Sequence, residues 1–185
     1  MKIWKYESYD DYVKAQTKAN VKKIKKVWVQ KSTINKIYNK IPMAASILCH
    51  GTRNAAEQKY FSDMYPMANI IGTEISYTAS DFPMTVQHDF HEVVNDWIGE
   101  FDIVYSNSFD HSYDPEKCMS TWANQLSTIG TLCIELQCGD NNTSKATDPL
   151  ELSYNDLIEL TSQRGLWLSH KLKLENNDML CMFRK

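Results

Sequence analysis

The sequence lacks the features that mark membrane, secreted or zinc-binding proteins. No apolar run comes near the roughly 20 residues that a membrane helix needs. The first residues, Met1-Lys2-Ile3-Trp4-Lys5, lack the apolar core of a secretory signal. The five cysteines form no C-x-x-C pair, so we expect reduced thiols, a cytoplasmic protein and no metal site. No repeat or interdomain linker divides the 185 residues, which suit one buried core.

Charge is unevenly distributed along the chain. Residues 1–40 contain eleven lysines and three acids, so this segment carries +8 and the remainder −11 of the net charge of −3. The segment is either an electropositive face for an anionic partner such as nucleic acid, or a solvated lysine face beside an acidic body. We favour the second interpretation, because a basic helix without interleaved aromatic residues is a weak signal for nucleic-acid binding.

The N-terminal segment, residues 1–42, is predicted to be helical from residue 8 to residue 40, with a break near 30–33. Apolar residues from Val21 to Ile41 recur at steps of three and four, which predicts one apolar stripe with lysines opposite. Pro42 ends the helix, since the residue before a proline avoids helical torsions.

From residue 43 onward, short apolar runs alternate with helical segments. This alternation predicts an α/β fold with a mostly parallel sheet and helices on both faces. The last two strands are joined by a short polar link and therefore form an antiparallel hairpin. Residues 137–150 are polar and are predicted to be a loop. The expected strands are 46–50, 69–73, 85–87, 101–105, 131–136, 166–174 and 179–183, and the expected helices are 55–64, 77–82, 115–127 and 154–164.

Polar residues with a recognisable spacing follow the first two of these strands. The first strand runs directly into Gly51 and a polar loop that opens a helix, and Glu74 ends the second strand, 23 positions after Gly51. A close backbone turn, a helix N-terminus and an acid placed for a ribose diol are what a nucleotide-like cofactor needs. The order predicts a cofactor-binding enzyme.

Five segments in order resemble the class I S-adenosylmethionine-dependent methyltransferases, in their small-molecule branch. The resemblance covers residues 43–185 and implies a Rossmann-like methyltransferase core with a seven-stranded sheet and an antiparallel C-terminal hairpin. It also implies that the basic segment 1–42 is a lid belonging to the same domain. The matching segments are Ile47-Leu48-Cys49-His50-Gly51, Ile70-Ile71-Gly72-Thr73-Glu74, Gln87-His88-Asp89-Phe90, Phe101-Asp102-Ile103-Val104-Tyr105-Ser106-Asn107, and residues 110–132.

The resemblance also implies roles for individual residues. Glu74 would accept hydrogen bonds from both ribose hydroxyls, and Asp89 would accept one from the adenine amino group. His111, next to Asp110, is the candidate general base because an imidazole titrates near neutral pH. The alternative for His111 is that it forms a wall of the cofactor pocket or a hydrogen bond within its loop. The expected cofactor contacts are His50, Gly51, Arg53, Glu74, Ile75, Asp89, Phe90, Ser106 and Asn107, and the expected catalytic residues are His111 and Asp110.

Two motifs depart from the family pattern. In the glycine loop, G-x-G-x-G, only Gly51 is kept, while Arg53 and Ala55 replace the other glycines. Either Arg53 swings aside to bind the methionine carboxylate, which we favour, or the pocket is altered or dead. Base-modifying members carry N-P-P-Y where this chain has Ser106-Asn107-Ser108-Phe109 without either proline, so a small metabolite ranks above nucleic acid.

We therefore predict a methyltransferase that uses S-adenosylmethionine to methylate a small-molecule acceptor, without a membrane partner and as a monomer or homodimer. Three alternatives stay open: a non-catalytic or regulatory S-adenosylmethionine-binding protein, an RNA or DNA methyltransferase that uses the basic N-terminus, and a nicotinamide enzyme, which fits the later motifs less well. The sequence does not identify the acceptor, because this scaffold serves many.

Overall fold

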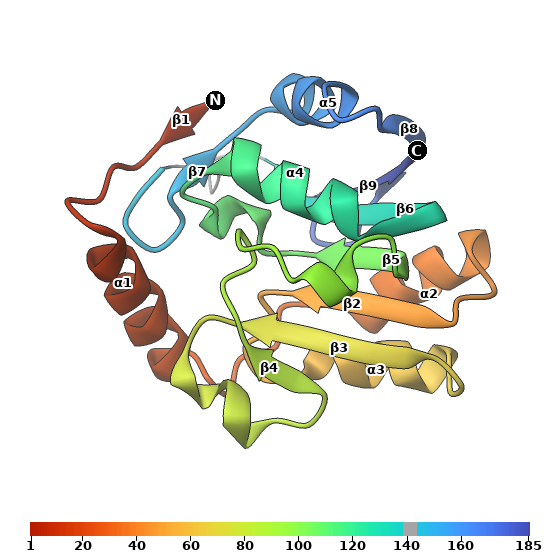
Figure 1. The fold of residues 1–185 in the computed structure, drawn as a ribbon, viewed down its shortest axis with the longest axis horizontal. Helices are drawn as coiled ribbons and strands as arrows, with labels where there is room; N and C mark the ends of the chain where they lie inside the picture. The colour runs from red at the N-terminus through yellow and green to blue at the C-terminus, as the bar shows by residue number, and fades with distance from the viewer. Residues whose placement is uncertain (139–143) are drawn as a thin grey trace.

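A seven-stranded sheet forms the centre of the computed structural model, which describes residues 1–138 and 144–185 (Figure 1). The strand order is β4-β3-β2-β5-β6-β9-β8. The strands from β4 to β6 pair in parallel, and β9 is antiparallel to both β6 and β8, which confirms the predicted fold class and hairpin. The strands are β2 (Ser46–His50), β3 (Asn69–Glu74), β4 (Thr85–Gln87), β5 (Phe101–Ser106), β6 (Leu126–Leu136), β8 (Trp167–Lys173) and β9 (Met179–Arg184).

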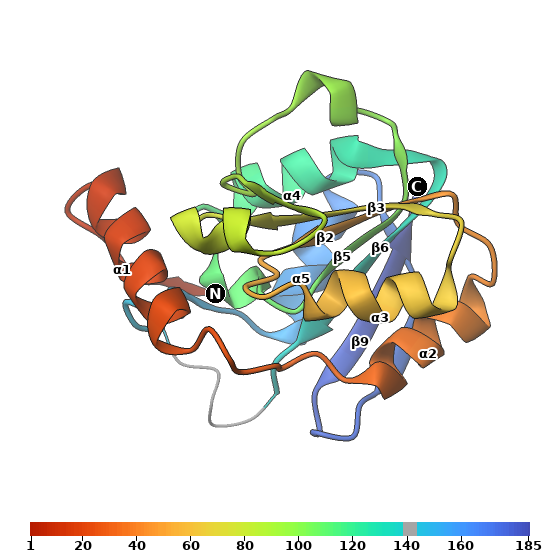
Figure 2. The ribbon, with the colours of Figure 1, turned by 90° about the horizontal axis from the view of Figure 1, so that it is seen from below.

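Helices cover both faces of this sheet (Figure 2). On one face lie α2 (Lys31–Lys40) and α3 (Ala56–Met64), and on the other α4 (Pro115–Gln125) and α5 (Tyr154–Ser162). The start of α4 is fixed locally, because the Asp114 side chain accepts from the backbone N–H of Lys117 and a proline occupies the first turn. Cys118 and Trp122 of α4, and Leu126 directly after it, are fully buried. Three short 3₁₀ segments, η1 (Tyr77–Asp81), η2 (Asn95–Trp97) and η3 (Phe109–His111), lie in the connections.

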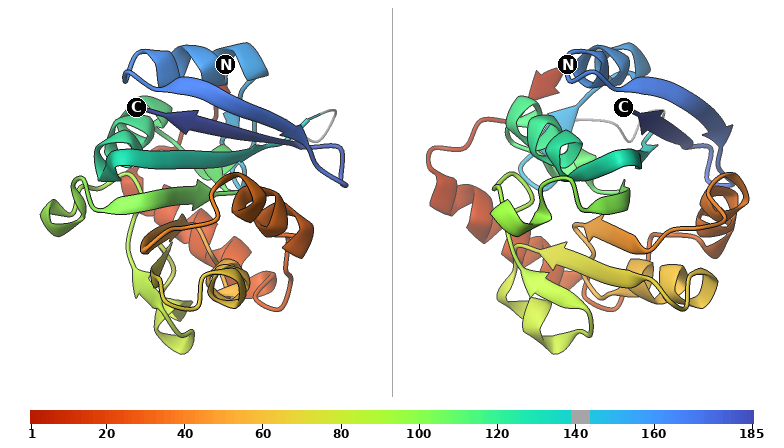
Figure 3. Two further views of the ribbon diagram at one scale, coloured as in Figure 1. Left: turned by 90° about the vertical axis from the view of Figure 1, so that its right-hand side faces the viewer. Right: turned by 45° about the vertical axis from the view of Figure 1, so that its right-hand side comes forward.

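The N-terminal segment divides into two helices with different positions. α1 (Tyr9–Lys22) lies across the end of the sheet where the parallel strands finish, whereas α2 packs Ile34 and Ile37 into the core beside α3 (Figures 1 and 3). The connection, residues 23–30, is not helical, so the predicted single apolar stripe is wrong there. Val27 and Trp28 remain about half exposed because no helix turns them toward a partner.

The remaining differences from prediction concern element ends and one short pairing. β6 begins at Leu126 rather than 131, because α4 leads directly into the strand. Two-residue strands β1 (Lys2–Ile3) and β7 (Leu150–Glu151) pair with each other at the end of the predicted loop 137–150, of which 139–143 lie outside the described residues. Among the described residues, no helix has the length and apolarity to cross a membrane.

Candidate functional site

Gly51 and Glu74 lie side by side at the carboxyl end of the sheet. β2 and β3 pair in register up to His50 and Thr73, so the next residue of each strand emerges at the same edge. Gly51 has φ +72°, and a Cβ there would lie 2.7 Å from the Cβ of Ser108. Only glycine fits this turn without strain. The loop then passes through Arg53 at φ 41° and reaches α3.

The Glu74 carboxylate is held by backbone donors. Its Oε2 accepts from the Arg53 N–H at 3.2 Å, and its Oε1 accepts from the Ser76 N–H at 2.9 Å. Burial raises the pKa of Glu74, and the Ser76 N–H opposes this shift. An ionised carboxylate offers about four lone-pair positions, so the two oxygens can still accept hydrogen bonds from a ligand diol.

Glu74 faces a small cavity beneath α1, which we call the α1 cavity, of about 40 Å³. Space of this size holds water but no nucleoside. Six predicted cofactor contacts meet at this cavity, and helix α1 closes it from the other side. The lining residues from the sheet end are Gly51, Arg53, Glu74, Ile75, Asp89, Phe90, Ser108 and His111, and those from α1 are Tyr12, Gln16, Ala19 and Asn20.

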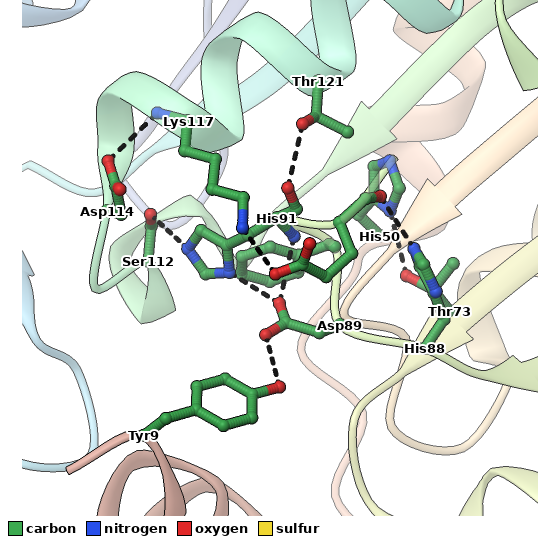
Figure 4. A network of polar contacts seen from close by, with 12 residues as sticks. Tyr9, His50, Thr73, His88, Asp89, His91, Ser112, Asp114, Lys117 and Thr121 are labelled. Atoms are coloured by element: carbon green, nitrogen blue, oxygen red, sulfur yellow. Dashed lines mark hydrogen bonds and ion pairs between the residues drawn. The ribbon is translucent and has the colours of Figure 1, made fainter. Parts of the chain in front are cut away.

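Asp89 is the centre of a hydrogen-bond network that ties α1 to the sheet (Figure 4). Its Oδ1 accepts from the backbone N–H of His91 at 3.0 Å and lies 2.6 Å from His91 Nδ1, and its Oδ2 accepts from the Tyr9 hydroxyl at 2.9 Å. Burial would raise the pKa of Asp89, but these bonds outweigh burial and leave the pKa below its ordinary value. Because an ionised carboxylate only accepts, His91 Nδ1 donates to it, and His91 Nε2 lies 2.8 Å from the Ser112 hydroxyl.

Two of the predicted cofactor residues, His50 and Ser106, point into the core and do not line the α1 cavity. His50 Nε2 donates to Gln125 Oε1 at 2.8 Å, its Nδ1 accepts from Thr73, and its ring stacks on Trp122. Complete burial lowers the pKa of His50 to about 3, so the ring is neutral. The Ser106 hydroxyl donates to the His50 carbonyl. Both side chains support the strand ends, and we leave them out of the proposed contact set.

A second, larger cavity of about 750 Å³ lies under residues 23–30, and we call it the linker cavity. It shares Gly51, Arg53, Ser108 and His111 with the α1 cavity. Asn107, a predicted contact, lines only this second space. Sequence reasoning did not single out four buried or half-buried acids in its wall. For Glu57, an acid in the first turn of a helix is ordinary, and nothing in the sequence separates a buried one from a solvated one. These acids are Glu57, Glu135, Asp148 and Asp178.

The predicted catalytic pair lies where the two cavities meet. His111 Nδ1 donates to Gln16 Oε1 at 2.8 Å, and its Nε2 lies 3.5 Å from Asp148 and 3.9 Å from Asp110. Burial raises the pKa of Asp110, which also accepts from Gln137. The ligand atoms of His111 and the two aspartates all lie within 4.8 Å of one another, a spacing that could hold a metal ion, although Lys145 already pairs with Asp148 at 2.8 Å.

The Arg53 side chain lines both cavities. Its Nε is buried and has no hydrogen-bond partner, and its guanidinium forms no ion pair within residues 1–138 and 144–185. Burial lowers the pKa of Arg53, and nearby Glu74 opposes this effect. A guanidinium between two cavities without an ion-pair partner suits an anionic group of a ligand.

Comparison with solved structures identifies the architecture. A 1,6-didemethyltoxoflavin-N1-methyltransferase from Burkholderia thailandensis, bound to 1,6-didemethyltoxoflavin and S-adenosylhomocysteine, matches 98% of this chain and 92% of its own, at a TM-score of 0.77 and 12% identity. The chain has the class I methyltransferase fold. A putative methyltransferase in complex with the Haloferax volcanii activator Trm112 matches with a TM-score of 0.73 at 12% identity, over 97% of this chain and 99% of its own.

A TehB-like S-adenosylmethionine-dependent methyltransferase from Corynebacterium glutamicum also has this methyltransferase fold, with a TM-score of 0.64 and 17% identity over 95% of this chain and 98% of its own. No protein-family model and no curated protein matches the sequence. The resemblance predicted from the motif order is therefore confirmed at the level of fold.

Proposed function

We propose that this protein is a methyltransferase that uses S-adenosylmethionine and methylates a small molecule. The supporting observation is the Glu74 carboxylate, held by the Arg53 and Ser76 N–H groups one strand away from the Gly51 turn and facing a cavity with Ile75 and Phe90. These residues offer an acceptor for a diol and apolar faces for a base. When bound, the cofactor would supply an electrophilic methyl group on a sulfonium.

Individual residues would make the contacts with the cofactor and the acceptor. Glu74 would hold the ribose, Ile75 and Phe90 would contact the adenine, and Arg53 would bind the carboxylate of the methionine part. Asp89 already receives three hydrogen bonds, so at most one lone pair of Oδ2 remains for the adenine amino group. Asn107 and His111 would face the acceptor. Much of the rate can come from alignment and exclusion of water rather than from a base.

Structural neighbours support both the cofactor and a small acceptor. The Burkholderia enzyme binds S-adenosylhomocysteine together with 1,6-didemethyltoxoflavin, and a glycopeptide N-methyltransferase with the same fold was solved with S-adenosylmethionine. A mitomycin 7-O-methyltransferase is another neighbour, so nitrogen and oxygen acceptors both occur on this fold.

Isothermal titration with S-adenosylmethionine and S-adenosylhomocysteine tests the proposal directly. We expect both to bind, and a labelled-methyl screen of host extract should then identify the product by mass. The proposal is wrong if neither compound binds at high micromolar concentration.

A second candidate function is a non-catalytic S-adenosylmethionine-binding protein. Two observations favour it: Arg53 stands where the family has glycine, and α1 closes the space in front of Glu74. Cofactor that binds but is never consumed, with any fraction of the extract, would select this function over the first.

A further inference from the structure

The floor of the linker cavity contains two buried carboxyl groups that the proposed cofactor contacts do not use. Glu57, in the first turn of α3, is 5% exposed, and Glu135, near the end of β6, is 8% exposed. The Tyr105 hydroxyl donates to Glu135 Oε1. Asn107 Nδ2 donates to Glu57 Oε1 at 3.3 Å. Each group thus has one oxygen held by the protein.

The second oxygen of Glu57 has no protein partner. Its Oε2 is fully buried and forms no hydrogen bond with any described residue. Buried polar atoms in folded proteins are nearly always paired, and an unpaired carboxyl oxygen in a low-dielectric site is unfavourable. Glu57 lines the open linker cavity, so a turn of its carboxyl group would bring Oε2 to a ligand that donates a hydrogen bond and supplies the missing partner.

The charges around the cavity indicate what kind of donor this is. The acids lie deep, whereas Lys23 and Lys26 lie at the partly exposed mouth. Lys145 already pairs with Asp148. Arg53 is close enough to lower the pKa of Glu57, but in the proposed function it binds the cofactor carboxylate. Among the described residues, neither Glu57 nor Glu135 forms an ion pair.

Burial gives both acids a high proton affinity. It raises the pKa of Glu57 to about 8, against the lowering by its own backbone N–H and by Asn107, and it raises the pKa of Glu135 to about 7. A cation beside a carboxyl group favours its charged form. The carboxyl group would therefore ionise when an ammonium group binds beside it. Its raised pKa would also make the carboxylate a stronger base for taking a proton from that nitrogen.

We propose that the linker cavity binds the amino group of the methyl acceptor, with Glu57 Oε2 as its hydrogen-bond partner, so that the acceptor is a primary or secondary amine. This assignment rests on the proposed function. Before the nitrogen can act as a nucleophile it must carry a free electron pair. In the bound ammonium group one N–H bond breaks and its electron pair stays on nitrogen. The proton forms an O–H bond with the ionised Glu57 Oε2. Trp28, exposed at the mouth, offers an aromatic face to the body of the acceptor.

A matched pair of probes tests this proposal: 2-phenylethylamine and its uncharged analogue 2-phenylethanol, titrated into the whole chain by NMR or calorimetry. We expect the wild-type protein to bind the amine at least about tenfold more tightly than the alcohol. Glu57→Gln should lose this preference, because the amide has the same shape but carries no charge. Glu159→Gln, which removes an exposed acid on α5, should keep it.

A second measurement needs no variant. The amine affinity of the wild-type protein should rise between about pH 6 and about pH 9, as Glu57 loses its proton, while the alcohol affinity stays constant. Equal binding of the two probes, an undiminished preference in Glu57→Gln, or no amine binding at millimolar concentration would overturn the proposal. A parallel titration with S-adenosylhomocysteine separates the two failures, because loss of cofactor binding refutes the proposed function and loss of amine binding refutes only this inference.

Discussion

The two cavities meet at Arg53 and His111 but are closed in different ways. Over the α1 cavity, hydrogen bonds from Tyr9 to Asp89, from His111 to Gln16 and from Thr78 to Asn20 hold helix α1 in place, and about 40 Å³ remains. Over the linker cavity, the covering segment 23–30 has no regular structure, and about 750 Å³ remains. A nucleoside can enter only if α1 moves, whereas a small acceptor needs no such movement. In the proposed function, cofactor entry is therefore the gated step.

The largest expected effect concerns the free energy of unfolding, which depends on the protonation of Glu57 in the linker cavity. The pKa of Glu57 is about 8 in the folded protein and near 4.5 when unfolded, so between these values the folded state holds a proton that the unfolded state has lost. Wild-type stability should fall by about 1.4 kcal/mol per pH unit as the pH rises through this window. Glu57→Gln removes this loss and should be more stable by on the order of 3 kcal/mol at neutral pH.

Urea unfolding at several pH values measures this difference. It should vanish near pH 4.5 and grow toward pH 8, whereas Glu159→Gln should follow the wild-type protein throughout. A Glu57→Gln protein that is less stable than wild type at pH 8 would show that the acid is already satisfied in the folded state.

The next effect concerns the α1 cavity. Glu74→Ala removes the carboxylate that would hold the ribose, and it leaves the Arg53 and Ser76 N–H groups without their acceptor. We expect S-adenosylhomocysteine binding to weaken by at least about 100-fold, which is about 2.7 kcal/mol. Calorimetric titration measures the change. Asp81→Ala, which removes an exposed acid in the nearby η1 segment, is the control and should bind as the wild type does.

A substitution of Arg53 tests whether this side chain, which lines both cavities, binds the methionine carboxylate of the cofactor. Arg53→Gln should weaken S-adenosylhomocysteine binding by about tenfold, or about 1.4 kcal/mol. Binding of 5′-methylthioadenosine, which lacks the amino-acid carboxylate, should not change. If both compounds lose affinity equally, Arg53 shapes the loop rather than binding the carboxylate, and if neither loses affinity the arginine has no role in the site.

The sequence predicted six of the seven strands of the sheet to within one residue at each end, because these strands are short apolar runs bounded by polar turns. It missed the first five residues of β6. Ser46–His50 and Thr85–Gln87 coincide with prediction. The β1–β7 pair could not be predicted, since two residues carry no periodicity and their partners lie far apart in the chain. Residues 23–28 were predicted wrongly, because the apolar spacing there is helical while no neighbouring helix or strand covers Val27 and Trp28.

The candidate site, like the fold, could be predicted from the sequence only in part. Gly51, Glu74 and Asp89 were placed correctly at one edge, because parallel strands end there and the order of motifs fixes which residues emerge. Spacing does not fix which way the last side chain of a strand points. His50 is directed to Gln125 and Trp122 rather than to the cavity. Glu57 was missed for a related reason, since its burial depends on the fold around it.

The smallest expected effect concerns the closure of α1 over its cavity. Tyr9→Phe removes the hydroxyl that donates to Asp89 at 2.9 Å and keeps the ring contacts with Tyr12 and Tyr113. A hydrogen bond to an ionised acceptor at a partly exposed site should contribute about 1 kcal/mol to stability. Because the same bond holds α1 closed, we expect S-adenosylhomocysteine to associate up to about fivefold faster in stopped-flow measurements. Tyr77→Phe, which alters an exposed ring outside both cavities, should change neither quantity. A Tyr9→Phe protein that loses stability but takes up the ligand at the wild-type rate would mean that entry does not require α1 to open at this end.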